Sequence, residues 1–275
     1  MDIRLFHVFR NTPLGRETLL QSIHFCKTVG TSLLIYIPKH TKFLMYFEND
    51  VVQVNLDSSY LAAPQSARRH AQELAEAGGI VPSFLDPKHF TTSTLPDVPI
   101  HFDFMCCPRS TNVLQSKSGL GNAGPRVRRI VKAARFAVLM TSEAYREWQR
   151  IAVFFGGSAN AVKALRLGLR MSQKTGCPLE IFTQVERGDE KAYRSIVAKA
   201  GLERAVAEQV RQWRFFKEGR FEENLYEVSH DALLIVGAFG HGVVRDFVFG
   251  SMMEKIQSIM PNNFLIAGPN YTAAS

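Results

Sequence analysis

Glycines gather between residues 236 and 252 at a spacing that suits the binding of an anion. Glycine permits tight turns and lets the backbone approach a ligand with no Cβ in the way. Successive backbone N–H groups form an anion-binding concavity, and the free N–H groups that open a helix add to it. After an apolar run that ends at Val236, the residues concerned are Gly237, Gly240, Gly242, Gly250 and Ser251. This stretch predicts a phosphate-binding loop.

The same residues also allow an interpretation without a ligand. Ser251 and Glu254 have the S-x-x-E spacing of a capping box, which satisfies the first N–H groups of a helix by itself. His241 could donate a hydrogen bond to a phosphate, or it could be a surface histidine with no ligand. Taken alone, the glycine pattern leaves both interpretations open.

An internal repeat positions this loop. When Gly30 is aligned with Gly176, residues 3–38 match the segment that begins at Arg150 without a gap. Each copy reads as a strand, a tight turn, an amphipathic helix, a glycine stop and a second strand. Ser158 is placed to cap its helix, and Gly176 is placed for a left-handed C-terminal cap. Strands that alternate with helices predict βαβ units with right-handed crossovers and a parallel sheet.

Hydrophobic periodicity gives the remaining elements. In the second copy it predicts helices over 191–201, 203–209, 221–229 and 251–259, and strands over 212–216, 231–236 and 264–267. In the first copy it predicts a hairpin over 42–56 and helices over 64–77 and 125–135, the last with basic residues around an apolar face. Residues 85–99 contain three prolines and give no convincing helix.

The pattern Gly237-x2-Gly240-x9-Gly250-Ser251 resembles the nucleotide loop of the universal stress proteins. The apolar strand before it, the helix after it and the final strand resemble the same family. The resemblance covers residues 149–270 and, through the repeat, extends more weakly to the first copy. It implies an α/β fold of two Rossmann-like (adenine-nucleotide alpha-hydrolase-like) domains, each an open five-stranded, mainly parallel sheet flanked by helices.

The resemblance also implies a domain organisation. Residues 1–148 are expected to form a degenerate universal-stress-protein-like domain with an inserted hairpin near 42–56. Residues 149–275 are expected to form the domain that carries the glycine loop. The two domains should pair through their last strands as an intramolecular pseudo-dimer. A monomer and a dimer of tandems both remain open.

ATP-binding members of the family hold the phosphates with the loop glycines and the serine, and the resemblance carries that role to this chain. The expected ligand-binding residues are Gly156, Val236, Gly237, Gly240, His241, Gly250, Ser251 and Met252. In those relatives the first strand usually ends in an aspartate that faces the adenine. Gly156 stands at that place here, so selection of adenine would rest on backbone and apolar contacts, or be relaxed or lost.

The first copy departs further from the pattern. Pro108 and Thr111 stand where the loop glycines belong, and Arg10 corresponds to Gly156. Proline has no N–H to offer a phosphate. We expect this half to be structural. Binding of another anion through Arg109, Lys117 or Arg126 is the alternative.

Composition narrows the class of protein. The 275 residues are 46% hydrophobic, contain no apolar run long enough to span a membrane and begin without a signal-peptide pattern. Four cysteines without metal spacing predict reduced, mostly buried thiols. We therefore expect a cytoplasmic protein with no membrane partner and no metal. The net charge of +8 allows nucleic-acid binding, but no recognition motif supports it.

Three functions remain from the sequence. The first is a cytosolic stress-response regulator that binds ATP or a related nucleotide in the second domain. The second is a scaffold or sensor for another small molecule or a protein partner, and the third is an enzyme such as an adenylyl transferase. The loop has no P-loop lysine, and Asp246, its only acid, suits a turn as well as catalysis, so at most slow ATP hydrolysis is expected. No catalytic residue is assigned.

Overall fold

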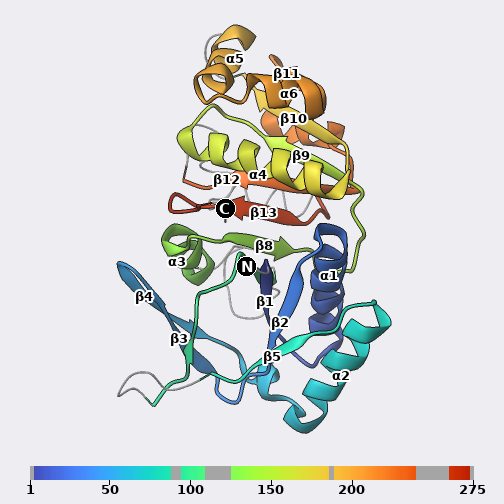
Figure 1. Ribbon diagram of the computed structural model, residues 1–275, viewed down its shortest axis with the longest axis vertical. Coiled ribbons are helices and arrows are strands. Elements are labelled where there is room, and N and C mark those ends of the chain that lie inside the picture. The colour runs from blue at the N-terminus through green and yellow to red at the C-terminus, as the bar shows by residue number, and fades with distance from the viewer. Residues whose placement is uncertain (1–2, 88–93, 109–124, 186–188, 240–259, 273–275) are drawn as a thin grey trace.

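The computed structural model describes residues 3–87, 94–108, 125–185, 189–239 and 260–272, and these form one long twisted sheet with helices on its faces (Figure 1). The strands of the first half are β1 (Arg4–Val8), β2 (Ser32–Tyr36), β5 (Ser83–Leu85), β7 (Phe104–Pro108) and β8 (Ala137–Thr141). Those of the second half are β9 (Arg150–Phe154), β10 (Leu179–Gln184), β11 (Val210–Phe216), β12 (Ala232–Gly237) and β13 (Phe264–Ala267).

The strand order is β11-β10-β9-β12-β13-β8-β7-β1-β2-β5. Neighbouring strands are parallel within each half, as the βαβ pattern predicts. Between the halves, β13 and β8 pair antiparallel, with Leu265 opposite Leu139. This is the pairing through the last strands that the resemblance implies. The two expected sheets are therefore continuous, and the chain has the Rossmann-like α/β fold in both halves.

Helices connect the strands and cover the sheet. In chain order they are α1 (Pro13–Val29), α2 (Pro64–Ala77), α3 (Pro125–Ala133), α4 (Ala159–Thr175), α5 (Glu190–Lys199), α6 (Glu203–Gln209) and α7 (Phe221–Asn224). The helix expected over 221–229 is shorter than predicted. It ends at Asn224 and continues as a 3₁₀ turn (Leu225–Glu227), because the backbone becomes extended at Val228 and leads into β12.

The two copies of the repeat form matching structures. α1 and α4 are both 17 residues long. The hydroxyl oxygens of Thr12 and Ser158 each accept a 3.1 Å hydrogen bond from the backbone N–H three residues further on, the expected N-cap. Gly30 and Gly176 end the two helices with φ of 67° and 71°, a conformation that favours glycine. The ungapped alignment of the repeat is confirmed at both ends of the helix.

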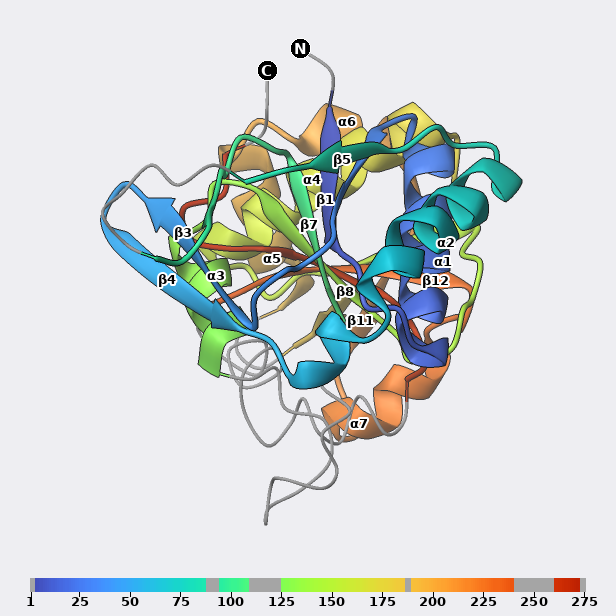
Figure 2. The ribbon, with the colours of Figure 1, turned by 90° about the horizontal axis from the view of Figure 1, so that it is seen from below.

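The predicted hairpin is present as β3 (Lys42–Phe47) and β4 (Asp50–Asn55), and β6 (Asp97–Val98) extends it into a separate three-stranded sheet. Figure 2 shows the hairpin beside α3, away from the helices α1 and α2. Arg129 and Arg135 bind the acidic tip of the hairpin through ion pairs of 2.7 Å to Asp50 and 2.6 Å to Glu48. These pairs are exposed, so the packing of β3 against the large sheet contributes more to its position.

Each face of the long sheet has a core that runs through both halves. Alternate residues of β12 point to opposite faces: Leu233 and Ile235 join the core under α1 and α4, whereas Leu234 and Val236 join the core under α3 and the hairpin. Figure 1 shows α1 and α4 on the same face of the sheet, one over each half. Because neither core stops at the junction of β8 and β13, the halves pack as one body.

A buried polar network fixes that junction. The backbone N–H of Ser142 donates to Asn263 Oδ1 at 2.8 Å, and Asn263 Nδ2 donates to Gln21 Oε1 at 2.7 Å. Gln21 Nε2 in turn donates to Ser142 Oγ at 2.9 Å. All three side chains are buried. A satisfied network of this kind specifies one docking geometry, because any shift would leave buried polar atoms without partners.

The polar groups of the first core are structural. His7 is buried in β1 with Nδ1 2.9 Å from Ser22 Oγ, and burial lowers the pKa of this histidine to about 3. The four cysteines are free, and Cys26, Cys106 and Cys107 are buried, as predicted. Burial raises the pKa of the Cys26 and Cys106 thiols to about 12, which makes them unreactive at neutral pH.

Candidate functional site

The second half has a topological switch point between β9 and β12. The chain runs from β9 through β10 to β11 on one side, then returns to place β12 on the other side of β9. Val236 pairs with Phe154, so the carboxyl ends of the two strands lie side by side. In open parallel sheets, ligands bind in the crevice outside the strand ends at such a point. Gly237, the first residue of the glycine pattern, ends β12 at this position.

The start of α4 lies at the same crevice. The helix begins at Ala159, directly after β9 and its turn, and Asn160 Nδ2 donates a 2.6 Å hydrogen bond to the backbone oxygen of Ala238. This bond fastens the end of β12 to the first turn of α4. A 17-residue helix presents its free N–H groups and the positive end of its dipole here. The arrangement suits a negatively charged group.

Packing also requires glycine at position 237, which could not be predicted from the sequence. A Cβ atom at this position would lie well inside van der Waals contact of the backbone oxygen of Asn160. The close approach of β12 to α4 therefore requires glycine whether or not a phosphate binds. Gly237 supports the geometry of the crevice, and it does not by itself indicate a ligand.

Phe239, two residues after β12, has a strained backbone conformation. Its φ is 57°, in the left-handed region that non-glycine residues rarely adopt, and 38% of the residue is exposed. Such strain costs about 1–3 kcal/mol and concentrates at functional sites. Sequence reasoning missed this position, because phenylalanine carries no signal for a left-handed backbone.

The described residues include three of the predicted site residues. Gly156 follows β9 at the crevice, and Val236 and Gly237 end β12. The Val236 side chain is fully buried in the core, so only its backbone can face a ligand. The predicted residues Gly240, His241, Gly250, Ser251 and Met252, with the helix expected over 251–259, lie outside the described residues.

Gly156 lies beside a well-packed turn. The next residue, Gly157, has a φ of 76°, and a Cβ there would come within 3.0 Å of Ile196 Cδ1 in α5. Gly156 itself is not in the left-handed region, so its backbone would accept another residue. The φ of Gly156 therefore does not require glycine at this position.

Two amides at the neighbouring strand end were missed by sequence reasoning. Phe182 pairs with Phe154, so Gln184 at the end of β10 lies at the same edge of the sheet as Gly156. Asn224 Nδ2 donates to Gln184 Oε1 at 2.7 Å, which holds the two amides together. Amides both donate and accept hydrogen bonds, as recognition of a base edge needs. No motif could have identified them, since α7 brings Asn224 here only through the fold.

The first half has the equivalent switch point between β1 and β7, and side chains fill it. The guanidinium of Arg10 lies 3.7 Å from the Asp57 carboxylate and 5.5 Å from the centre of the Tyr60 ring. Burial raises the pKa of Tyr60, Arg10 lowers it, and the nearby thiols of β7 raise it further. The short 3₁₀ helix η1 (Ser58–Leu61) therefore places Tyr60 beside Arg10.

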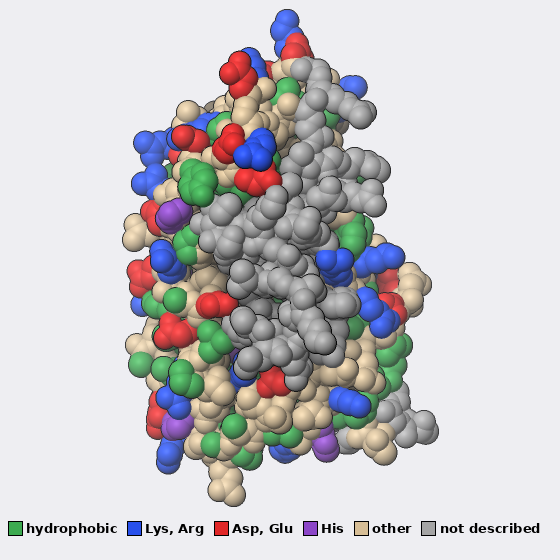
Figure 3. Space-filling model, turned by 180° about the vertical axis from the view of Figure 1, so that it is seen from behind, with side chains coloured by type: hydrophobic (Ala, Val, Ile, Leu, Met, Phe, Trp, Pro, Cys, Tyr) green, Lys and Arg blue, Asp and Glu red, His purple; other side chains and the backbone are tan. Residues whose placement is uncertain are grey.

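Surface charge does not single out another site on the back of the molecule. In Figure 3 the Lys and Arg side chains of the described residues are interspersed with Asp and Glu. Within the described part of the chain, no three His, Cys, Asp or Glu side chains are grouped as metal ligands. No helix among the described elements has the length and apolarity to cross a bilayer.

Comparison with known proteins relates this fold to the universal stress proteins. No family model matches the sequence, and no curated protein matches it. A universal stress protein from Archaeoglobus fulgidus DSM 4304 has a similar structure, with a TM-score of 0.61 and 14% identity over 96% of this chain and 98% of its own. A putative universal stress protein from Pseudomonas aeruginosa UCBPP-PA14 also matches, with a TM-score of 0.52 and 14% identity over 97% and 93%.

The cytoplasmic domain of a prokaryotic cation chloride cotransporter shares the fold as well, with a TM-score of 0.53 and 11% identity over 97% of this chain and 95% of its own. At these identities the likeness concerns the fold. The chain has the fold of the universal stress proteins over nearly its whole length. One fold can serve proteins of different function, so the function has to be argued from the site.

Proposed function

We propose that this chain is a tandem universal stress protein that binds ATP or a related nucleotide in its second half and regulates a stress response in the cytoplasm. The observation that carries the proposal is the meeting of three features at one edge of the sheet. These are the β9–β12 switch point, the start of α4 and the beginning of the glycine pattern after Gly237. Each of them suits a phosphate, and the start of α4 and the glycine pattern come from segments far apart in the chain.

In this proposal the phosphates bind to backbone N–H groups. Gly240, Gly250 and Ser251 would supply them from the loop, and the first turn of α4 would add its dipole. His241 would donate to a phosphate, with Met252 beside it. The base would lie toward Gly156, where the amides of Gln184 and Asn224 replace the missing carboxylate as hydrogen-bonding groups. Such a site would hydrolyse ATP slowly at most, and the proposal assigns no catalytic residue.

The test is a thermal-shift titration with ATP, AMP and cyclic AMP. A ligand that binds only the folded protein raises its melting temperature. We expect saturable stabilisation by at least one nucleotide, and its loss in Gly240→Val. The matched control is Thr111→Val, at the corresponding position of the first half, which should keep the response. Absence of a shift with all three nucleotides would contradict the proposal.

The second candidate is a sensor or scaffold that has lost nucleotide binding. The residue at Gly156 favours it, because the φ at this position does not require glycine and the chain still has no aspartate there. The protein as purified separates the two candidates. An absorbance at 260 nm above that of the protein would indicate bound nucleotide and favour the first. Its absence, together with a flat thermal-shift titration, would favour the second.

A further inference from the structure

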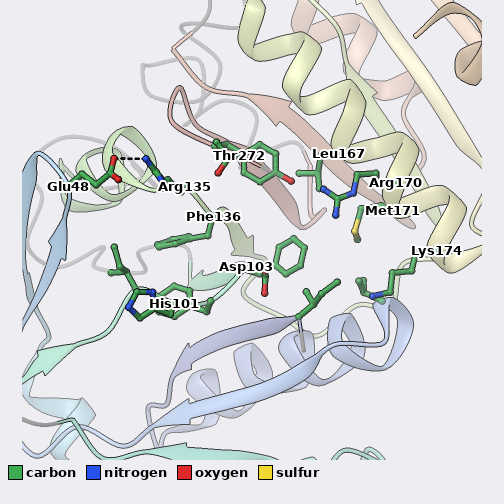
Figure 4. Close-up of a pocket in the computed structure, with 16 residues that line it drawn as sticks. Glu48, His101, Asp103, Arg135, Phe136, Leu167, Arg170, Met171, Lys174 and Thr272 are labelled. Carbon is green, nitrogen blue, oxygen red and sulfur yellow. Dashed lines mark hydrogen bonds and ion pairs between the residues drawn. The ribbon is translucent and has the colours of Figure 1, made fainter. Parts of the chain in front are cut away.

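A cavity of about 390 Å³ lies between the two halves of the chain (Figure 4). One wall is the last part of α4, and the opposite wall comes from residues around the starts of β1, β7 and β8. Small-molecule sites typically measure about 300–1,000 Å³ and are frequent between domains. The residues that line the cavity all belong to the described part of the chain, and none of them is a predicted nucleotide-binding residue.

Aromatic rings that pack on one another form the apolar wall of the first half. The ring centre of Phe102 lies 4.8 Å from that of Phe6 and 4.6 Å from that of Phe136. The ring of Phe104 meets that of Phe25 edge to face, with centres 5.0 Å apart. Because each of the phenylalanines that border the cavity packs against another side chain of the core, this wall is preformed and does not depend on a ligand.

Two apolar side chains of α4 form the facing wall. Leu167 and Met171 are four residues apart, so they lie on the same face of the helix, and both line the cavity. Figure 4 shows them across the cavity from Phe136. Both are buried, so they belong to the core and still border an open space. A leucine and a methionine opposite aromatic rings suit a flat hydrophobic body.

The charged groups around the cavity already have partners or reach water. Arg135 forms a 2.6 Å ion pair with Glu48, which Figure 4 shows as a dashed line. Asp103 accepts a 2.9 Å hydrogen bond from the first backbone N–H of β1, and Arg170 has an interaction partner of its own. Two further basic side chains are exposed to water, those of His101 and Lys174. A charge on a buried ligand would therefore leave water without gaining a counter-charge, which favours an uncharged ligand.

Tyr271 brings one hydroxyl group to this apolar setting. The backbone N–H of the next residue, Thr272, donates a 3.0 Å hydrogen bond to the backbone oxygen of Arg135, which fixes this segment beside the first half. Burial raises the pKa of Tyr271, Arg170 lowers it and Asp103 raises it, and the net upward shift keeps the phenol protonated at neutral pH. Among the described residues, none forms a hydrogen bond with this hydroxyl. A phenol can both donate and accept one, so it can pair with a polar group of a ligand.

We propose that this cavity is a second binding site, for an uncharged, flat, hydrophobic molecule that carries one hydroxyl or carbonyl group. The ring system lies between Phe136 on one side and Leu167 and Met171 on the other, and the polar group forms a hydrogen bond with the Tyr271 hydroxyl. Nucleotides do not suit this site, because their phosphate charges would face apolar walls. Since both halves form the walls, the ligand stabilises their docking and raises the melting temperature of the whole chain.

The probe is 2-naphthol, with naphthalene-2-carboxylate as its charged counterpart. Binding to the full chain is measured by saturation-transfer NMR and by thermal shift. We expect 2-naphthol to bind saturably and the carboxylate to bind at least about tenfold more weakly, because its charge would be buried without a counter-charge. Tyr271→Phe should weaken 2-naphthol about fivefold, as expected for the loss of one hydrogen bond. Tyr226→Phe, at an exposed tyrosine that does not line the cavity, is the matched control and should bind as the parent does.

Filling the cavity is a second test. In Leu167→Phe the larger side chain should occupy the open space, so the variant should lose 2-naphthol binding, and the melting temperature of the free protein should hold or rise. Leu165→Phe is the matched control, because Leu165 is a fully buried leucine of the same helix that does not line the cavity. There the added atoms have no open space, so overpacking should lower the melting temperature.

Three results would overturn the proposal. The first is the absence of saturable 2-naphthol binding at millimolar concentration. The second is equal affinity for 2-naphthol and the carboxylate, which needs no variant and so holds even if a variant fails to fold. The third is unchanged binding to folded Leu167→Phe, or competitive displacement by ATP, either of which would place the probe elsewhere. Unchanged affinity in Tyr271→Phe would overturn the role of its hydroxyl. Failure of nucleotide binding alone leaves this site untouched, because the two sites share no residue.

Discussion

The two switch points of this molecule have the same arrangement of strands and helices but different side chains. At the β9–β12 crevice of the second half, Gly156 follows β9, Gly237 ends β12, and α4 begins beside them. At the β1–β7 crevice of the first half, Arg10 takes the place of Gly156, and its guanidinium lies over the Tyr60 ring. Since the helices and their caps are equivalent, the difference lies in the side chains at the strand ends.

This contrast shows what a repeated fold retains when one copy changes its role. The N-caps, the left-handed glycines and the strand pairings persist, because they hold the sheet and helices together. The residues that follow the first strand of each half differ, with Arg10 in one copy and Gly156 in the other. In the first half, Arg10, Asp57 and Tyr60 contact one another at the switch point, which suits a structural domain.

The largest expected loss of stability comes from adding a side chain where β12 approaches α4 closely. In Gly237→Ala, the new methyl group would overlap the backbone oxygen of Asn160, and overpacking against backbone should cost about 3 kcal/mol or more. Chemical denaturation measures the loss. Gly79→Ala is the control: its φ of 81° is strained but the space around it is open, so the cost should be near 1 kcal/mol. Equal costs would contradict the close packing at the crevice.

Acid should destabilise the first half through His7, because the corresponding residue of the second half, Val153, does not titrate. The unfolded chain binds a proton near the ordinary pKa of 6.5, whereas burial holds the folded pKa of His7 at about 3. Protonation therefore favours unfolding. Stability is intact above pH 6.5 and falls by about 1.4 kcal/mol per pH unit as the pH drops toward 3.

His7→Gln keeps a hydrogen-bonding group for Ser22 but does not titrate. The difference in unfolding free energy between the parent and this variant, measured from pH 7 to pH 4, should shrink steadily on acidification. Parallel curves for the two proteins would show that His7 does not bind protons differently in the folded and unfolded states.

Gly156→Asp tests whether the second half lacks only the carboxylate that would face the adenine. The backbone at Gly156 is not left-handed, so an aspartate fits without that strain. A hydrogen bond between a charged group and the ligand is worth about 1.5–3 kcal/mol, so we expect adenine nucleotides to bind roughly tenfold more tightly. Guanine nucleotides should gain little, which serves as the control. No gain for ATP would mean that the base does not lie at Gly156.

The smallest effect is expected in the first half. Arg10→Gly removes an ion pair and a cation–π contact, both partly exposed, so the loss of stability should be below about 1 kcal/mol. It should not create nucleotide binding, because Tyr60 and Pro108 remain. Calorimetric stoichiometry checks this. A second nucleotide bound per chain in Arg10→Gly would show that the arginine alone closes the crevice.

The features that could be predicted from the sequence are those determined by neighbouring residues in the chain. Helix ends at Ser158 and Gly176, the hairpin and the apolar strand of β12 follow from capping chemistry and periodicity. The network of Gln21, Ser142 and Asn263 could not be predicted, because its partners are far apart in the chain. The same is true of the contact between Arg10 and Tyr60, of the amide pair Gln184 and Asn224, and of the cavity between the halves. The short strands β5 and β6 have too few residues to show a period.

The central claim, that one half binds nucleotide and the other does not, is tested most directly by isothermal titration calorimetry with ATP. The account predicts saturable binding of one nucleotide per chain, abolished in Gly240→Val and unchanged in Thr111→Val. Binding of two nucleotides per chain, or binding that survives Gly240→Val and disappears in Thr111→Val, would contradict it.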